Sequence, residues 1–156
     1  MRHELKTKDR LKITGWVKLL ANGKVVAESH NLITTVGKAL VGDMLIDVSG
    51  YDTGLTYCAI GTGTTTPTVA NTTLVTETAR TTITYKERSS NTLFLQTLFL
   101  AANCNVFIKE VGLFGHSTAS GAANSGVLFA RALLSYDNSG GSPVDLTLQW
   151  RITLGS

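Results

Sequence analysis

Proline, cysteine and charged residues are all scarce in this chain of 156 residues. It contains two prolines and two cysteines, and only 16% of its residues are charged. Soluble domains usually carry about a quarter of charged residues, so we expect part of this surface to meet other protein rather than open water. Glycine and threonine are frequent instead, a bias that is typical of β-structure with many turns.

Long apolar runs are also missing, and this bears on membrane insertion and secretion. No run reaches 18 apolar residues, so no membrane-spanning helix is predicted. The stretch after Met1 is polar, so no signal peptide is expected. Cys58 and Cys104 lie in apolar surroundings, which favours two buried, reduced thiols over a disulfide.

Motifs for catalysis, cofactors and metals are absent from the sequence. Gly61-Thr62-Gly63 is half of a dinucleotide fingerprint, but Pro67 stands where the helix should form. His3, His30 and His116 lie far apart, without the spacing of a zinc site. We therefore expect no catalytic residue, no cofactor and no metal, and predict that the chain is not an enzyme.

Alternating apolar and polar residues predict strands at both ends of the chain. Residues 11–20 place Val17 and Leu19 on one face and Trp16 on the other. Asn22-Gly23 then predicts a hairpin to a partner strand over 25–33. Residues 144–154 alternate without a fault, which makes this the clearest strand of the sequence.

The middle of the chain predicts one helix and further strands. Thr34 or Thr35 can cap a short helix that ends near Ile46 and covers one end of the sheet. Residues 55–60 are predicted as a strand, and residues 80–88 as a single strand with one wet face.

Two segments, 92–100 and 127–134, are apolar on both faces and are predicted to be buried on both sides. In a small antiparallel protein, the opposite sheet and a neighbouring subunit could supply the two covers. The first segment includes Leu93, Phe94 and Leu95 and would otherwise be prone to aggregate. We therefore predict a homo-oligomer, a trimer or a dimer, or a dependence on another partner.

About eight short strands with turn signals indicate an all-β fold. The pattern favours an antiparallel β-sandwich, jelly-roll-like, with one short helix and a long Gly/Thr-rich loop. The length suits a single domain over 11–156, preceded by a basic arm over 1–10.

The basic arm is the strongest charge asymmetry of the sequence. Residues 1–24 hold seven basic and two acidic residues, among them Arg2, Lys6, Lys8 and Arg10. Such an arm predicts contact with an acidic protein surface, and nucleic acid is the less favoured partner because no DNA-reading motif accompanies it. A solvated terminus remains the alternative. Truncating residues 1–10 should leave folding intact, because no apolar periodicity begins before Leu11.

Four charged residues stand in apolar or turn-rich surroundings: Glu77, Arg80, Glu110 and Arg131. We interpret them as buried or half-buried ion pairs rather than as a carboxylate site for chemistry. Glu110 is placed on one face with Ile108 and Phe114, so it needs a partner. Arg80 or Arg131 is the expected one, and the pair should hold the long loop.

The long loop itself follows the strand that ends at Ile60 and runs through Gly, Thr, Pro and Asn to Arg80. A loop of this length without regular structure is uncommon and usually functional or an interface. Its sequence, Ile60-Gly61-Thr62-Gly63 with Pro67, Leu74, Glu77 and Arg80, is followed by Glu110-Val111-Gly112-Leu113-Phe114. The combination resembles the bacteriophage tail-collar fibre domain and its short relatives among phage virion proteins, over roughly residues 13–154.

This resemblance implies a non-enzymatic virion structural protein, assembled in the host cytoplasm as a subunit of the tail or fibre-collar region. Its expected partners are other virion proteins, without a membrane. Tail-collar domains head a longer fibre, whereas this sequence stops at Ser156. A capsid decoration (cement) protein on the head surface therefore stays an alternative. A receptor- or carbohydrate-binding module is less favoured, because the predicted loops offer only Tyr51, Tyr136 and His116 as ring-bearing side chains.

Overall fold

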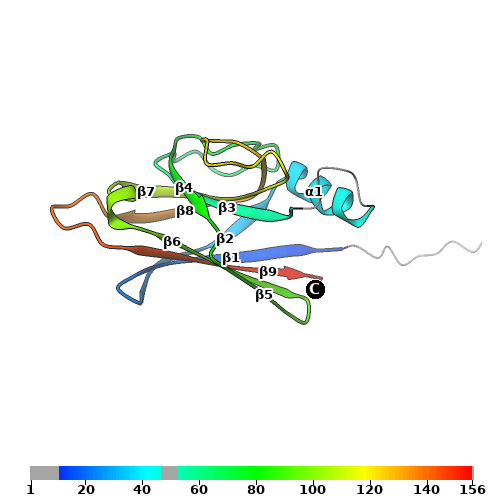
Figure 1. Cartoon of the computed structure of the whole chain (residues 1–156), viewed down its shortest axis with the longest axis horizontal. Helices are drawn as coiled ribbons and strands as arrows, with labels where there is room; N and C mark the ends of the chain where they lie inside the picture. The colour runs from blue at the N-terminus through cyan, green and yellow to red at the C-terminus, as the bar shows by residue number, and fades with distance from the viewer. Residues whose placement is uncertain (1–10, 47–52, 156) are drawn as a thin grey trace, which may run out of the picture.

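Nine β-strands and one α-helix form the fold in a computed structural model, which describes residues 11–46 and 53–155 (Figure 1). The elements in chain order are β1 (Ile13–Ala21), β2 (Lys24–Ile33), α1 (Thr35–Leu45), β3 (Leu55–Gly61), β4 (Glu77–Thr82), β5 (Tyr85–Ser89), β6 (Thr92–Phe99), the 3-10 turn η1 (Ala101–Asn103), β7 (Phe107–Gly115), β8 (Val127–Asp137) and β9 (Leu146–Leu154). The all-β prediction is confirmed, with nine strands where about eight were expected.

All strands pair antiparallel in one curled sheet, in the order β4-β3-β7-β8-β2-β1-β9-β6-β5. Strand β2 connects its two halves, because its first part pairs with β1 and its last residues, Leu32 and Ile33, pair with β8. The sheet thereby folds into two layers (Figure 1). We call β2-β1-β9-β6-β5 the β9 layer and β8-β7-β3-β4 the β7 layer.

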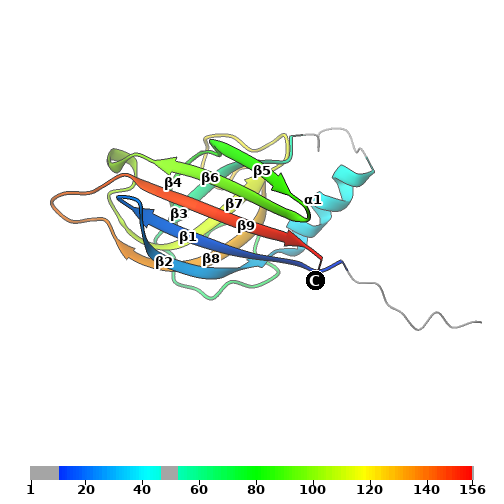
Figure 2. The ribbon, with the colours of Figure 1, turned by 90° about the horizontal axis from the view of Figure 1, so that it is seen from below.

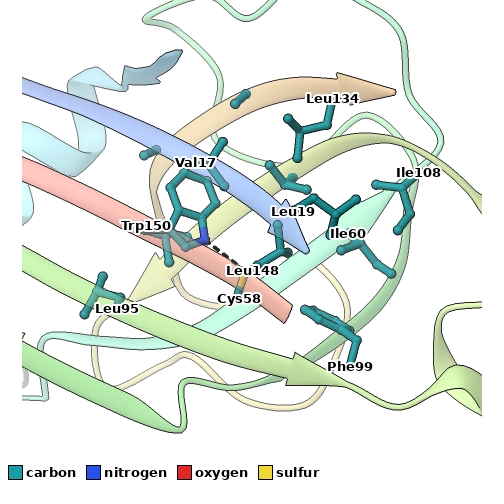
Figure 3. Packing of buried hydrophobic residues seen from close by; sticks show 14 of the residues in the cluster. Val17, Leu19, Cys58, Ile60, Leu95, Phe99, Ile108, Leu134, Leu148 and Trp150 are labelled. Atoms are coloured by element: carbon teal, nitrogen blue, oxygen red, sulfur yellow. Dashed lines mark hydrogen bonds between the residues drawn. The ribbon is translucent and has the colours of Figure 1, made fainter. Parts of the chain in front are cut away.

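The main hydrophobic core lies between these layers. Alternation along β1 and β9 directs Val17, Leu19 and Trp150 inward, where they meet Ile60 and Val111 of the β7 layer. The indole N–H of Trp150 donates to the Cys58 sulfur at 3.3 Å, which satisfies the buried ring (Figure 3). Cys58 and Cys104 are both free and buried, so the prediction of two reduced thiols is confirmed.

Local signals in the first third of the chain are also confirmed. Asn22 and Gly23 both have positive φ, 51° and 74°, as a tight hairpin between β1 and β2 requires. Thr34 caps α1 by accepting from the amide of Gly37 at 2.9 Å. The helix lies at one end of the two layers (Figure 1).

The prediction of one strand over residues 80–88 is wrong, because the chain changes layers in its middle. Strand β4 ends at Thr82 and β5 begins at Tyr85. Between them, the amide of Ile83 donates to Thr56 of the β7 layer and the amide of Thr84 donates to Gln96 of the β9 layer. The alternation continues through the crossing, so it gives no sign of the break.

The two apolar segments have different surroundings from those predicted. Residues 128–132 of β8 are fully buried, but the chain's own loop supplies the second cover, through Leu74 packed on Leu128. On β6, Leu95 and Phe99 are buried, whereas Leu98 is 43% exposed. The prediction that β6 is buried on both sides is therefore wrong for this chain alone.

The basic arm with Arg2, Lys6, Lys8 and Arg10 lies outside the described residues, as does Tyr51. Within the described ranges, no helix is both long and apolar enough to cross a membrane.

Candidate functional site

Residues 62–76 form an irregular loop that lies over the outer face of the β7 layer (Figure 1). Its apolar anchor is Leu74, which is 2% exposed and packs on Ala59, Phe114 and Leu128. Backbone hydrogen bonds fix both its base, from Thr62 to Thr76 at 3.0 Å, and its far side, from Thr35 to Val69 at 2.8 Å. The loop is therefore part of the packed structure.

Glu110 of β7 is the polar centre beneath this loop. Its carboxylate is fully buried and accepts three backbone amides, from Gly63 at 3.1 Å, Val75 at 3.0 Å and Thr76 at 2.7 Å. The fourth bond comes from Arg131 Nε at 2.9 Å. Both carboxylate oxygens thus accept two hydrogen bonds each, which uses the normal acceptor capacity of the group.

Arg131 of β8 extends this centre to the middle of the loop. Its guanidinium also lies 2.8 Å from Glu110 through Nη2, with both side chains fully buried. Nη2 donates to the carbonyl of Thr65 at 2.8 Å, and Nη1 donates to Asn71 at 3.1 Å. The predicted partnership of Glu110 with Arg80 or Arg131 is therefore confirmed for Arg131, which explains a charge inside an apolar strand.

The close approach of the loop to the strands accounts for three glycines, one in the loop and two in the strands beneath it. A Cβ atom on Gly63 would stand 2.3 Å from Glu110 Oε1, and one on Gly61 would stand 2.3 Å from the carbonyl of Thr76. On β7, a Cβ on Gly112 would meet Leu74 at 2.9 Å. These positions require glycine because the loop backbone approaches the strands closely.

A second ion pair, Glu77 with Arg80, ties down the neighbouring loop over residues 116–126. The two groups meet at 2.6 Å with both side chains 2% exposed, and Arg80 lies 4.2 Å from the centre of the Phe114 ring. Arg80 donates to the carbonyl of Ser125 at 2.9 Å, and Glu77 accepts from the amide of Asn124 at 2.9 Å. We call the two pairs together the double clamp: Glu110–Arg131 and Glu77–Arg80.

One detail of the predicted register is wrong, because the pairing of β7 with β8 is irregular beside Glu110. The pairing of β7 with β8 shifts between Ile108 and Glu110. Ile108 consequently belongs to the core between the layers, while Glu110 and Phe114 face the loop. Across this shift β8 has one residue more than β7, and such an irregularity changes the face on which the β7 residues lie.

The remaining predicted residues are distributed over both layers. Leu113 lies in the core between the layers, as does Leu95. Leu93 packs against the edge of that core, whereas Phe94 points outward beneath Arg151, 5.6 Å from its ring centre. The β6 residues therefore lie away from the double clamp.

The chemistry of the double clamp is that of a structural support. Four accepted hydrogen bonds leave the Glu110 carboxylate no lone pair for a substrate. Burial raises the pKa of the Cys58 thiol to about 12, which keeps it protonated and unreactive. In the ranges that the structure describes, no group of three or more His, Cys, Asp or Glu side chains is placed to hold a metal ion.

The sequence interpretation missed the outer face of the β9 layer, where Trp16 and Tyr85 are 41% and 51% exposed. Alternation alone indicated that Trp16 points outward. Which side chains lie beside it depends on the pairing of β1 with β9, and no local pattern encodes that register.

Comparison of the chain with protein-family models, with curated proteins and with solved structures found no significant match.

Proposed function

We propose that this chain is a non-enzymatic structural protein of a bacteriophage particle, an assembly subunit of the tail or fibre-collar region. The proposal begins from the resemblance of residues 57–80 and 107–115 to tail-collar domains. The observation that carries it is the double clamp, in which Glu110 of the second segment accepts hydrogen bonds from three backbone amides of the first and is itself paired with Arg131. A surface held in one conformation loses little entropy on assembly, which suits a subunit contact.

The loop over the β7 layer offers an apolar contact for such assembly. Val69 and Val75 are 49% and 51% exposed although the backbone beside them is hydrogen-bonded to the body of the protein. Exposed apolar side chains on a fixed backbone suit a contact with a second copy or with another virion protein. The basic arm would add a salt-sensitive contact to an acidic neighbour.

Electron microscopy of particles that carry a tagged copy of the chain tests this function. Label at the tail or collar is expected. Label over the head would identify the capsid decoration alternative instead, and particles without label would contradict a virion role altogether.

Light scattering on the purified full-length chain tests the predicted oligomer. A dimer or trimer is expected, and Val69→Asp together with Val75→Asp should shift the chain toward monomer. Thr72→Asp together with Thr73→Asp is a matched control, since the two changes add the same charge at exposed polar positions of the same loop. A stable monomer of the unmodified chain at high micromolar concentration would contradict the oligomer.

A further inference from the structure

The outer face of the β9 layer is open over most of its width. Figure 2 shows β5, β6, β9 and β1 side by side, and no described helix or loop passes over them. A depression of about 540 Å³ lies on this face, between Trp16 and Tyr85. Aromatic and polar side chains line it together.

Strand pairing arranges these side chains in two rows across the sheet. In the first row, Trp16 of β1 is opposite Arg151 of β9, which is opposite Phe94 of β6. The second row runs from Lys18 through Gln149 and Gln96 to Tyr85. The face therefore has aromatic side chains toward both ends and planar amides between them.

We propose that this face is a binding site for a neutral, β-1,4-linked chain of pyranose sugars. The C–H groups on the flat side of such a ring are weakly positive and stack on the negative face of an aromatic ring. Its hydroxyl groups both donate and accept hydrogen bonds at the rim of the ring. Trp16 and Tyr85 supply exposed aromatic surface, and the amides supply both donors and acceptors.

The side-chain amides of Gln96 and Gln149 are already oriented to bind a sugar hydroxyl group. Gln149 Nε2 donates to Gln96 Oε1 at 3.1 Å across the strands. The carbonyl oxygen of Gln149 and the amino group of Gln96 make no further hydrogen bond within the described chain. One acceptor and one donor thus remain side by side for a hydroxyl group.

The charge of the face favours a neutral ligand. Lys18 and Arg151 line the depression together with Glu28 and Glu87, so the two signs balance. Lys18 and Glu28 also lie within 3.6 Å of each other. A nucleic acid or another polyanion would need an excess of basic groups. A second copy of the chain would need an apolar centre, whereas charged side chains lie across this one.

The size and flatness of the face favour an extended chain of several sugars. Across the strands, Trp16 and Tyr85 are separated by three strand spacings, about 14 Å in that direction, which exceeds one sugar ring. Chains with β-1,4 links and equatorial hydroxyl groups are flat ribbons, whereas α-1,4-linked glucose chains curl. The flat ribbon is the shape that can contact aromatic groups at both ends.

Tryptophan fluorescence of the full-length chain tests the proposal, because the protein has two tryptophans and Trp150 is buried. The probes are cellohexaose and the hexamer of N-acetylglucosamine, with maltohexaose as the curled control. At least one β-1,4-linked probe should change the emission saturably, and maltohexaose should bind weakly or not at all.

Calorimetry on variants assigns the binding to this face. Trp16→Ala and Gln149→Ala should each weaken binding of the preferred probe about tenfold. Phe107→Ala is the matched control and should bind as the parent does, since Phe107 is a 39% exposed aromatic side chain on the β7 layer. No binding of either β-1,4-linked probe at millimolar concentration would overturn the proposal. Equal binding by the Trp16 variant, or a preference for maltohexaose, would overturn it as well.

Discussion

The outer face of the β7 layer is buried under residues 62–76, whereas no described segment covers the outer face of the β9 layer (Figures 1 and 2). Both faces carry charged residues, but in different states. Glu110 and Arg131 are fully buried and hydrogen-bonded, while Lys18 and Glu28 are about half exposed. A charge on the covered face therefore contributes to the fold, and a charge on the open face is available to the surroundings.

The difference follows from the backbone of the covering loop. An irregular loop has amides without strand partners, and burying them without acceptors is costly. Glu110 accepts three of these amides, including Gly63 and Thr76, and Arg131 donates to a loop carbonyl. The strands beneath the open face pair with one another, so their backbone amides already have acceptors and need no buried carboxylate.

Glu110→Gln gives the largest expected effect and tests the covered face directly. An amide cannot accept all four hydrogen bonds and leaves Arg131 as an unpaired buried charge. The free energy of unfolding should fall by about 3–5 kcal/mol, measured by urea denaturation. A cycle with Arg131→Met should show coupling above about 0.5 kcal/mol.

Glu28→Gln is the matched control on the open face. Its carboxylate is about half exposed, so the same chemical change should alter the stability by less than about 1 kcal/mol. If Glu110→Gln is as stable as the parent chain, the carboxylate does not support the loop.

Aromatic truncation compares the two faces a second time. Phe114 is fully buried beneath Leu74 and Arg80, so Phe114→Ala should cost about 3–5 kcal/mol of unfolding free energy. Trp16→Ala on the open face should cost less than about 1 kcal/mol. Similar losses for both variants in thermal or urea unfolding would remove the distinction between the faces.

Gly63→Ala tests the packing of the loop with a single added methyl group. The added Cβ would stand 2.3 Å from Glu110 Oε1, so we expect a loss of about 1–3 kcal/mol in unfolding free energy. Gly42→Ala is the control, because nothing lies within 4 Å of its Cβ position in α1. It should stabilise the chain by about 0.5–1 kcal/mol. Stability gained at Gly63 would mean that the loop is not held against Glu110.

The effect that is smallest at neutral pH concerns Cys58, in the core between the two faces. Burial raises its pKa from 9.0 to about 12, so the folded chain keeps a proton that the unfolded chain releases above pH 9. The stability of the parent relative to Cys58→Ala should therefore be constant below pH 9. It should then fall by about 1.4 kcal/mol per pH unit up to about pH 12. Urea denaturation of both proteins at several pH values measures this slope. If the stabilities of the parent and of Cys58→Ala depend on pH in the same way, folding does not raise the pKa of the thiol.

Local patterns predicted those parts of the fold that depend on neighbouring residues. The alternation of β1 and β9, the Asn22-Gly23 hairpin and the Thr34 cap are all of this kind. An arginine partner for Glu110 was also predictable, because a charge inside an apolar strand needs an opposite charge, although the sequence left Arg80 and Arg131 as alternatives.

Other features depend on contacts that the sequence does not display. The crossing at Ile83 and the irregular pairing beside Glu110 both leave the alternation of apolar residues intact. They nevertheless change the layer or the face on which the following residues lie. The cover of β8 by its own loop is such a feature, because nothing in the sequence around Leu74 shows that this residue packs on Leu128. The rows on the open face require the register of four strands at once.

The pairing of β1 with β9 has a consequence for how this chain folds. Ile13 pairs with Leu154, so β1, the first strand of the chain, can complete its pairing only after β9, the last strand, has been made. Such long-range pairing slows folding, to roughly milliseconds or seconds for all-β domains. Until β9 docks, β1 and β6 each have an unpaired edge, and β6 carries the apolar segment that includes Leu93 and Leu98. During synthesis on the ribosome, this interval is when the chain is most exposed to misassembly with its own copies.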